Sequence, residues 1–271
     1  MLLGNRYQIQ EPIGRGLLAI VYRGIDIRTD HVVAIKVLRE VYSSDPKFAR
    51  RFQKEAAVIS SLQHPNIVQI YDSGQADGTY FTVMELVEGT DLRHYLRARG
   101  ILDANSALMI AHEVALGLGA AHRRGIVHRA VIPQHILMGR DGRVVLTDFS
   151  IASVFKMSHE EQDIEGTSLN TVPNSPPEQA MGEVVTPAAD VYSLGGTMYE
   201  MLTGHPVFDG DSPVVVAMQH IQQRPKPPSQ YNPTVPTVLE ELIMRCLEKE
   251  PEMRFRDGSV LARSLAALLH A

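Results

Sequence analysis

Two charged residues stand at positions where the surrounding pattern predicts apolar side chains. Lys36 lies inside an otherwise apolar run with the composition of a β-strand, residues 32–38. Glu55 falls on the inward-facing stripe of a helix that the spacing predicts over residues 46–62. A buried carboxylate is costly unless a cation meets it, so we expect Lys36 and Glu55 to pair and to mark a site.

Two glycines upstream of Lys36 have a spacing that suits phosphate binding. Gly14 and Gly16 lie between two runs with strand character. Glycine lets backbone N–H groups approach phosphate oxygens closely. Ala19 occupies the third glycine position of the usual G-x-G-x-x-G pattern, so this segment taken alone favours a simple hairpin turn.

The elements that would carry these residues change in type along the chain. Residues 80–84 form a second β-rich run, so the first third is predicted to be mainly strands with one helix. From about residue 90 the pattern is helical, with a wide apolar face over residues 107–118 and a capped helix over residues 187–202. We therefore expect a small β-rich lobe, a joint near residues 85–89 and a larger helical lobe.

Composition narrows the class of protein. The 271 residues are 44% hydrophobic and 21% charged, which is typical of a globular protein and excludes disordered and collagen-like classes. The formal net charge of −5 provides no basic field for nucleic acid or an anionic membrane. A single cysteine, Cys246, excludes a disulfide framework and suits a reducing cytosol. Without a signal peptide or a membrane-spanning run, we expect a cytoplasmic location, no nucleic-acid partner and no membrane contact by this segment.

Lys36 belongs to the first of several motifs that occur in a fixed order. They are Val33-Ala34-Ile35-Lys36, His128-Arg129-Ala130, Asp148-Phe149-Ser150, Pro176-Pro177-Glu178, Asp190-Val191-Tyr192-Ser193-Leu194-Gly195 and Arg254. This ordered set resembles a protein kinase domain over nearly the whole chain, from residue 7 to residue 269. The stretches 175–179, 208–213 and 217–220 are typical of the eukaryotic-like Ser/Thr kinases of bacteria.

The resemblance implies an α+β fold with two lobes. A small antiparallel β-sheet lobe with one major helix would cover residues 7–86, and a hinge would cover residues 87–90. A larger, mainly helical lobe would cover residues 91–269, so that residues 1–271 form a single protein-kinase-like domain.

The resemblance also implies a nucleotide site. Lys36, held by Glu55, would contact the α- and β-phosphates of ATP, and Asp148 would hold magnesium. The other nucleotide-binding positions would be Gly14 and Gly16 over the phosphates, Val21, Ala34 and Leu137 around the adenine, Met84 behind it, and the backbone of Glu85 and Val87 at its edge.

Other matching positions would hold the fold together instead of taking part in turnover. They are His128, Phe149, Glu178, Asp190 and Arg254. Glu178 and Arg254 would form an ion pair, and Asp190 would anchor the backbone of the catalytic loop. The activation segment offers candidate phosphorylation sites at Thr167, Ser168 and Thr171.

The catalytic loop departs from the family pattern His-Arg-Asp-x-Lys-Pro-x-Asn. Ala130 replaces the aspartate that accepts the substrate proton, and Ile132 replaces the lysine that steadies the γ-phosphate. His135 replaces the asparagine that binds a second magnesium, an ion that prefers oxygen ligands to imidazole nitrogen. The lost base and the lost charge stabilisation together predict a rate lower by about 10⁵-fold.

These losses predict a catalytically inactive relative, a pseudokinase that acts as a signalling scaffold or an allosteric regulator. Its partners would be proteins, either an active kinase or a signalling complex, and relatives suggest a homodimer through the small lobe. ATP would bind weakly or without metal, and the role of magnesium stays open. Because relatives often continue into a membrane anchor, the chain could be the cytoplasmic part of a membrane-attached protein.

Alternatives to an inactive domain stay open. The first is a Ser/Thr protein kinase with residual or unorthodox ATP-dependent phosphoryl transfer, because Lys36 and Asp148 survive. The second is that His135 and Asp148 bind a transition metal such as Mn²⁺ or Zn²⁺. A simple loss of the magnesium ligand at position 135 is the favoured interpretation. The third is that the loop was engineered, although Ile132 and His135 would be unusual substitutions for that purpose.

Overall fold

The chain folds into two compact units, Met1–Glu88 and Gly89–Ala271, called here the N-terminal and the C-terminal unit. The boundary follows Glu88, within the range 87–90 assigned to the hinge. The computed structural model describes residues 2–16, 18–43, 52–53, 56–149 and 174–270.

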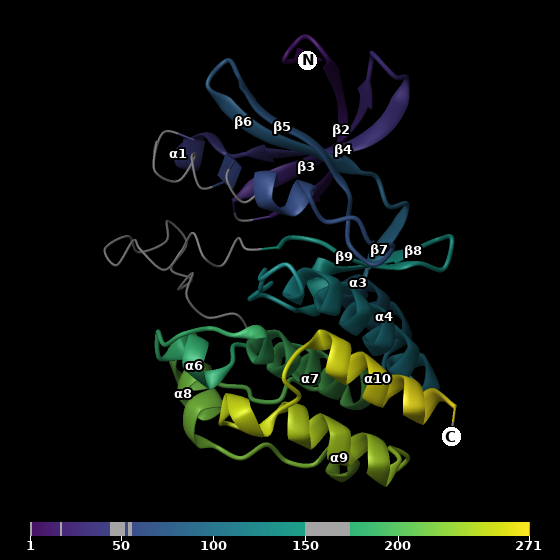
Figure 1. Cartoon of the computed structure of the whole chain (residues 1–271), viewed down its shortest axis with the longest axis vertical. Helices are drawn as coiled ribbons and strands as arrows, with labels where there is room; N and C mark the ends of the chain where they lie inside the picture. The colour runs from purple at the N-terminus through teal and green to yellow at the C-terminus, as the bar shows by residue number, and fades with distance from the viewer. Residues whose placement is uncertain (1, 17, 44–51, 54–55, 150–173, 271) are drawn as a thin grey trace. The chain divides into compact units, whose positions relative to one another are not determined.

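The N-terminal unit is built on an antiparallel sheet with the strand order β1-β2-β3-β4-β6-β5 (Figure 1). Its strands are β1 (Leu2–Leu3), β2 (Tyr7–Arg15), β3 (Ala19–Asp26), β4 (His31–Leu38), β5 (Ile70–Ala76) and β6 (Thr79–Glu85). The runs predicted over residues 32–38 and 80–84 are thus β4 and β6. Strand β1 precedes residue 7, where the small lobe was expected to begin, because Leu2–Leu3 pairs with β2 and buries Leu3.

The hairpin between β5 and β6 shows why these residues turn where they do. Asp77 and Gly78 both have positive φ, at 49° and 78°. An Asp-Gly pair tolerates this left-handed conformation, which matches the twist of the flanking strands. In the same unit, helix α1 covers Glu40–Ser43, and residues 56–60 within the predicted helix 46–62 are helical.

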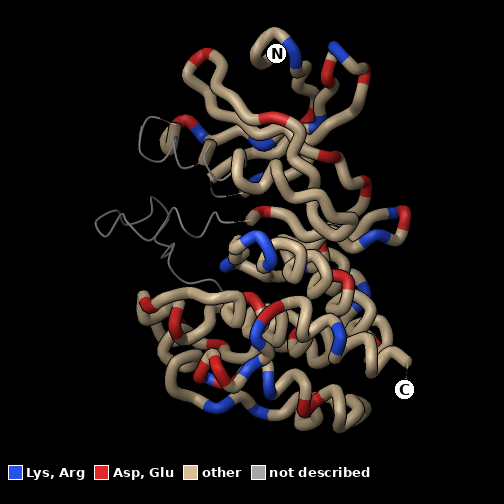
Figure 2. The backbone as a smooth tube through the Cα atoms, in the orientation of Figure 1, with Lys and Arg blue, Asp and Glu red and all other residues tan. Residues whose placement is uncertain are grey.

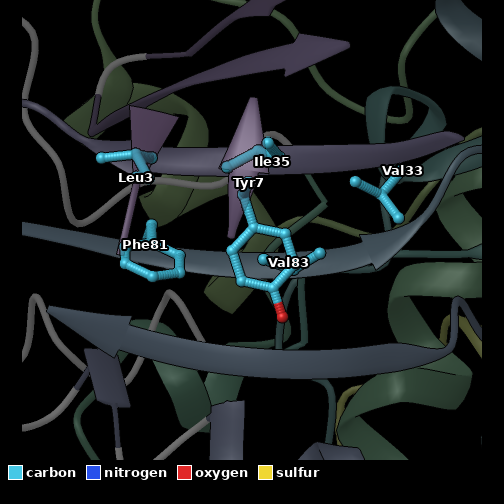
Figure 3. Packing of buried hydrophobic residues seen from close by; sticks show 6 residues of the cluster. All are labelled: Leu3, Tyr7, Val33, Ile35, Phe81 and Val83. Carbon is cyan, nitrogen blue, oxygen red and sulfur yellow. The ribbon is translucent and has the colours of Figure 1, made fainter. Parts of the chain in front are cut away.

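Alternation along β4 separates the two faces of the sheet. Val33 and Ile35 point into an apolar cluster, while Ala34 and Lys36 lie on the opposite face. The cluster also contains Leu3, Tyr7, Phe81 and Val83 (Figure 3). A Cβ atom at Gly24 would lie 2.3 Å from Ile35 Cδ1 and 2.9 Å from the backbone oxygen of Gln8, so any larger residue there would force the neighbouring strand or the cluster to shift.

The C-terminal unit is mainly helical (Figure 1). Its helices are α3 (Leu92–Arg99), α4 (Ala104–His122), α6 (Pro177–Ala180), α7 (Pro187–Thr203), α8 (Pro213–Gln222), α9 (Thr237–Cys246) and α10 (Gly258–Leu269). Short 3₁₀ turns cover Pro133–His135, Pro228–Gln230 and Pro251–Met253. Helix α7 is buried along almost its whole length, and it ends at Gly204, whose φ of 72° suits a left-handed helix cap.

A small sheet in this unit was not predicted. Strands β7 (Gly89–Asp91), β8 (Ile136–Gly139) and β9 (Val144–Leu146) pair in that order. Strands of three or four residues are too short to show an alternating pattern, so the sequence alone does not reveal them. They matter because β8 directly follows the turn that contains His135, and β9 ends two residues before Asp148.

Two further features of the described residues are the distribution of their charges and the length of their helices. Acidic and basic residues are interspersed along both units (Figure 2). In the part of the chain that the structure describes, every helix is too short or too polar to cross a bilayer.

The apolar cluster of the N-terminal unit is expected to dominate its stability. Ile35→Ala should lower the free energy of unfolding by about 2–5 kcal/mol, because Ile35 is fully buried and its truncation leaves a cavity. Val32→Ala, a neighbouring change at a side chain 42% exposed, should stay within about 0.5 kcal/mol. Chemical denaturation followed by circular dichroism measures both. Equal losses for the two variants would contradict the assignment of the faces.

Candidate functional site

Asp190 organises the loop around residues 128–135. It lies on α7, is fully buried, and accepts hydrogen bonds from the backbone amides of His128 and Arg129, each at 2.7 Å. His122 Nε2 is a third donor at 2.8 Å. The amide of Gly258 donates to Nδ1 of the same ring at 3.0 Å, so the His122 proton sits on Nε2. The carboxylate therefore holds both the loop and helix α4.

The buried ring of His128 stabilises the same loop. Its Nε2 donates to the carbonyl of Thr147 at 2.9 Å, and its Nδ1 accepts from the amide of Ala130 at 3.2 Å. The Phe149 ring packs against it with centroids 4.4 Å apart. Burial lowers the pKa of His128 to about 4, so the ring is neutral at physiological pH.

Backbone strain is concentrated at two residues of the site. Arg129 and Asp148 have positive φ values of 69° and 61°, which cost non-glycine residues about 1–3 kcal/mol each. The Arg129 carbonyl accepts a hydrogen bond from Gln179 Nε2 at 3.0 Å, in addition to the bond from its amide to Asp190. The surrounding bonds thus keep the loop in a conformation that it would not adopt alone.

The three positions that depart from the family pattern lie together in this loop. Ala130 is buried, Ile132 is half-buried, and the amide of His135 donates to the carbonyl of Ile132 at 2.9 Å. His135 Nδ1 donates to the carbonyl of Ala130 at 2.8 Å, and its Nε2 lies 3.8 Å from Asp148 Oδ2. One donor of this pair is a nitrogen, which does not fit the all-oxygen magnesium site that the resemblance implied.

A buried ion pair joins Glu178 to Arg254. The two guanidinium nitrogens of Arg254 donate to the Glu178 carboxylate at 2.7 and 2.9 Å, and both side chains are almost fully buried. The carbonyls of Ala188, Lys249 and Glu248 accept the other Arg254 hydrogen bonds. A buried pair of charges is tolerated only when its hydrogen bonds are satisfied in this way.

In the N-terminal unit, four of the predicted nucleotide-binding residues share one face of the sheet. Val21 pairs with Lys36 across β3 and β4, and Ala34 pairs with Met84 across β4 and β6. Residues that lie directly opposite in an antiparallel sheet project to the same side. Lys36 is 9% exposed, so it is a largely buried cation on the face away from the apolar cluster.

The remaining predicted residues are placed as follows. Gly14 pairs with Val21, and the amide of Gly16 donates to the carbonyl of Ala19 at 2.9 Å, which closes the β2–β3 hairpin. The amide of Glu85 donates to Gln69, Val87 is half-buried, and Leu137 lies on β8. Glu55, Ser150 and the candidate phosphorylation sites Thr167, Ser168 and Thr171 lie outside the described residues.

Sequence reasoning missed part of this network. It gave no role to His122, whose buried ring donates a hydrogen bond to Asp190. It also passed over Gln179 and over Thr197, whose hydroxyl donates to the carbonyl of Val131 at 3.2 Å. The only signal for Gln179 was its place in the family-typical stretch 175–179, because a glutamine or threonine in a helix has no pattern of its own.

Comparisons with known proteins place these features in a family. The family model described as protein kinase domain matches residues 7–265. The Bacillus subtilis protein named serine/threonine-protein kinase PrkC is 41% identical over 259 residues, which are 94% of this chain and 40% of the relative. Serine/threonine-protein kinase PknB of Mycolicibacterium smegmatis is 36% identical over 267 residues, 97% of this chain and 43% of the relative.

The fold comparison agrees. A crystal structure of the Mycobacterium tuberculosis PknI kinase domain has a TM-score of 0.80 and 27% sequence identity, and covers 100% of this chain and 98% of that one. The two-lobed α+β fold that the motifs predicted is therefore confirmed. The chain spans about two fifths of the length of these curated relatives.

The comparisons overturn one expectation. We expected a catalytically inactive domain, but relatives 36–41% identical over nearly the whole chain are named serine/threonine-protein kinases. They point to a kinase enzyme instead of an inactive relative. The expectation was wrong because it added up the groups lost at Ala130, Ile132 and His135 and gave little weight to the positioning that the rest of the site retains.

The Glu178–Arg254 pair is expected to be essential for the C-terminal unit. Glu178→Ala should lower the free energy of unfolding by about 3–5 kcal/mol, because it leaves a buried guanidinium without its partner. Glu11→Ala removes a carboxylate that is exposed and 3.9 Å from Arg23, and should change it by less than about 1 kcal/mol. Chemical denaturation compares them, and a loss below about 1 kcal/mol for Glu178→Ala would contradict this view.

Burial of His128 should make stability depend on pH. The pKa of His128 is about 4 in the folded chain and about 6.5 when unfolded, so only the unfolded state gains a proton between these values. Stability present above pH 6.5 is then lost as the pH falls towards 4, by up to about 1.4 kcal/mol per pH unit. His128→Phe should show a shallower slope in denaturation curves over this range, and identical slopes would exclude the effect.

Proposed function

The chain belongs to the protein kinase family, and from this premise we propose that it is a Ser/Thr protein kinase that transfers the γ-phosphoryl group of ATP with an unorthodox catalytic loop. The names and identities of its relatives support this proposal. The observation that carries it is the Asp190 network, which holds the loop backbone although the side chains at 130, 132 and 135 differ from the family pattern.

The chemistry makes the proposal reasonable. Phosphoryl transfer passes through a loose transition state, so catalysis depends mainly on positioning and electrostatic stabilisation. Loss of a general base costs about 10²–10⁴ in rate and leaves measurable turnover when the rest of the site is held. In this chain Lys36 would bind the phosphates, Asp190 and Gln179 would keep the loop in place through its backbone, and the proton of the substrate hydroxyl would pass to water.

The cofactor and partners follow from the same premise. The protein kinase family generally binds ATP together with magnesium. We propose that this chain also needs a divalent cation, since ATP binding without metal has no supporting observation. Its partners would be proteins that present a serine or threonine hydroxyl, and a cytoplasmic location would supply the ATP. The relatives are longer, so these proposals concern the segment that matches them.

A phosphorylation assay tests the proposal. The full chain is incubated overnight with radiolabelled ATP, a Ser/Thr peptide library, and Mg²⁺ or Mn²⁺, and incorporation is measured together with intact mass. We expect label above that of Lys36→Ala, no loss with Arg39→Ala at an exposed neighbouring cation, and a rate at least about 10²-fold higher for Ala130→Asp, which restores a base.

Binding must be measured beside transfer. A thermal shift with ATP, run with each metal, shows whether the site takes the nucleotide, because a ligand at about 100 times its Kd adds roughly 2.7 kcal/mol. If ATP raises the Tm and no label exceeds the Lys36→Ala control, the kinase proposal is wrong. Regulation through binding would then be the function to test next.

A further inference from the structure

We propose that His135 and Asp148 form a site for a first-row transition-metal ion that accepts imidazole nitrogen, and that this ion is bound in preference to magnesium. The inference deepens the proposed function, on which it rests for the nucleotide that would accompany the ion. It begins from a mismatch, because the resemblance implies an all-oxygen magnesium site and the structure places a ring nitrogen there.

The hydrogen bond from His135 decides which nitrogen is available. A carbonyl oxygen can only accept, so the contact of 2.8 Å between Nδ1 and the Ala130 carbonyl requires the proton on Nδ1. In the neutral ring, Nε2 then carries a lone pair. A second hydrogen bond of this kind is how proteins commonly set the tautomer of a metal-binding histidine.

The distance fits two ligands of one ion. His135 Nε2 lies 3.8 Å from Asp148 Oδ2. Two donors at bond lengths of about 2.0–2.2 Å lie roughly 3.0–3.5 Å apart on a metal, so a small side-chain rotation is enough. Both residues lie next to regular secondary structure, which fixes their backbone: His135 is at the end of a 3₁₀ turn, and Asp148 comes shortly after β9.

Exposure leaves room for other ligands. The side chains of His135 and Asp148 are 21% and 28% exposed, so both are partly buried and still accessible to solvent. No third His, Cys, Asp or Glu joins them among the residues that the structure describes. The remaining ligands would be water or phosphate oxygens of the nucleotide, which ties occupancy to nucleotide binding.

The donor set selects the class of metal. Imidazole nitrogen suits later first-row ions, and affinity for such sites rises from Mn²⁺ to Co²⁺ and beyond. Magnesium is a hard ion that keeps oxygen ligands. A Co²⁺ > Mn²⁺ > Mg²⁺ order is therefore expected. The competing interpretation is an ion pair between a protonated His135 and Asp148, which would bind no metal.

The chain contains a matched control for this geometry. His112 Nδ1 lies 3.8 Å from Glu113 Oε1, and the His112 side chain is 22% exposed. This pair is therefore equal to the proposed site in donor types, separation and histidine exposure. It differs because its members are sequence neighbours on α4, outside the catalytic loop that contains His135.

The experiment measures metal binding without catalysis. The full chain is titrated with Co²⁺, Mn²⁺ or Mg²⁺ in the presence of ADP, and the Tm and the visible absorption of Co²⁺ are recorded. We expect Co²⁺ to act at a concentration at least about tenfold below that of Mg²⁺, because Co²⁺ accepts imidazole nitrogen whereas Mg²⁺ keeps oxygen ligands. His135→Asn should remove this preference and the nitrogen-dependent Co²⁺ spectrum, whereas His112→Asn should keep both.

Every outcome bears on the site. Equal responses to Co²⁺ and Mg²⁺, an unchanged preference in His135→Asn, or an equal loss in His112→Asn would each overturn the proposal. A Tm unaffected by any of the metals would favour the ion pair and overturn it too. A preference for Co²⁺ without phosphoryl transfer would support this metal site and reject the proposed kinase activity. Phosphoryl transfer without a metal preference would support the kinase activity and reject the metal site.

Discussion

The buried carboxylate of Asp190 is the interaction on which the candidate site depends. A full negative charge inside a protein is tolerated only if donors surround it. Here the donors are the amides of His128 and Arg129 and the ring of His122, so the carboxylate is satisfied by the loop that it positions. Because α7 is buried along almost its whole length, this anchor cannot shift without disturbing the core of the C-terminal unit.

This arrangement separates the conformation of the loop from the chemistry of its side chains. The loop is held through backbone amides and carbonyls, which exist whatever residue occupies position 130 or 132. Even His135 contributes, since its ring bonds to the Ala130 carbonyl. Substitutions in the loop can therefore alter proton transfer and metal choice while the fold stays the same. That separation explains why counting lost side chains led to the wrong expectation of inactivity.

The buried pair of Glu178 and Arg254 applies the same principle elsewhere in the unit. Arg254 uses its guanidinium to join the Glu178 carboxylate and several backbone carbonyls, so one residue links segments far apart in sequence. In the N-terminal unit, Lys36 is the corresponding buried charge, on the sheet face opposite the apolar cluster. In each case a charged residue stands where packing alone would favour an apolar one.

The sequence by itself determined the family, the strand and helix types, and which residues break the apolar pattern. Local periodicity reveals β4 and α7, and the ordered motifs reveal Asp148, Asp190 and Arg254, because both signals are written in neighbouring residues. Tertiary structure alone decided the rest: the short sheet β7–β8–β9, the role of His122, and the tautomer of His135. These depend on which atoms meet across tens of residues, and hydrogen bonds between distant segments leave no periodic trace in the chain.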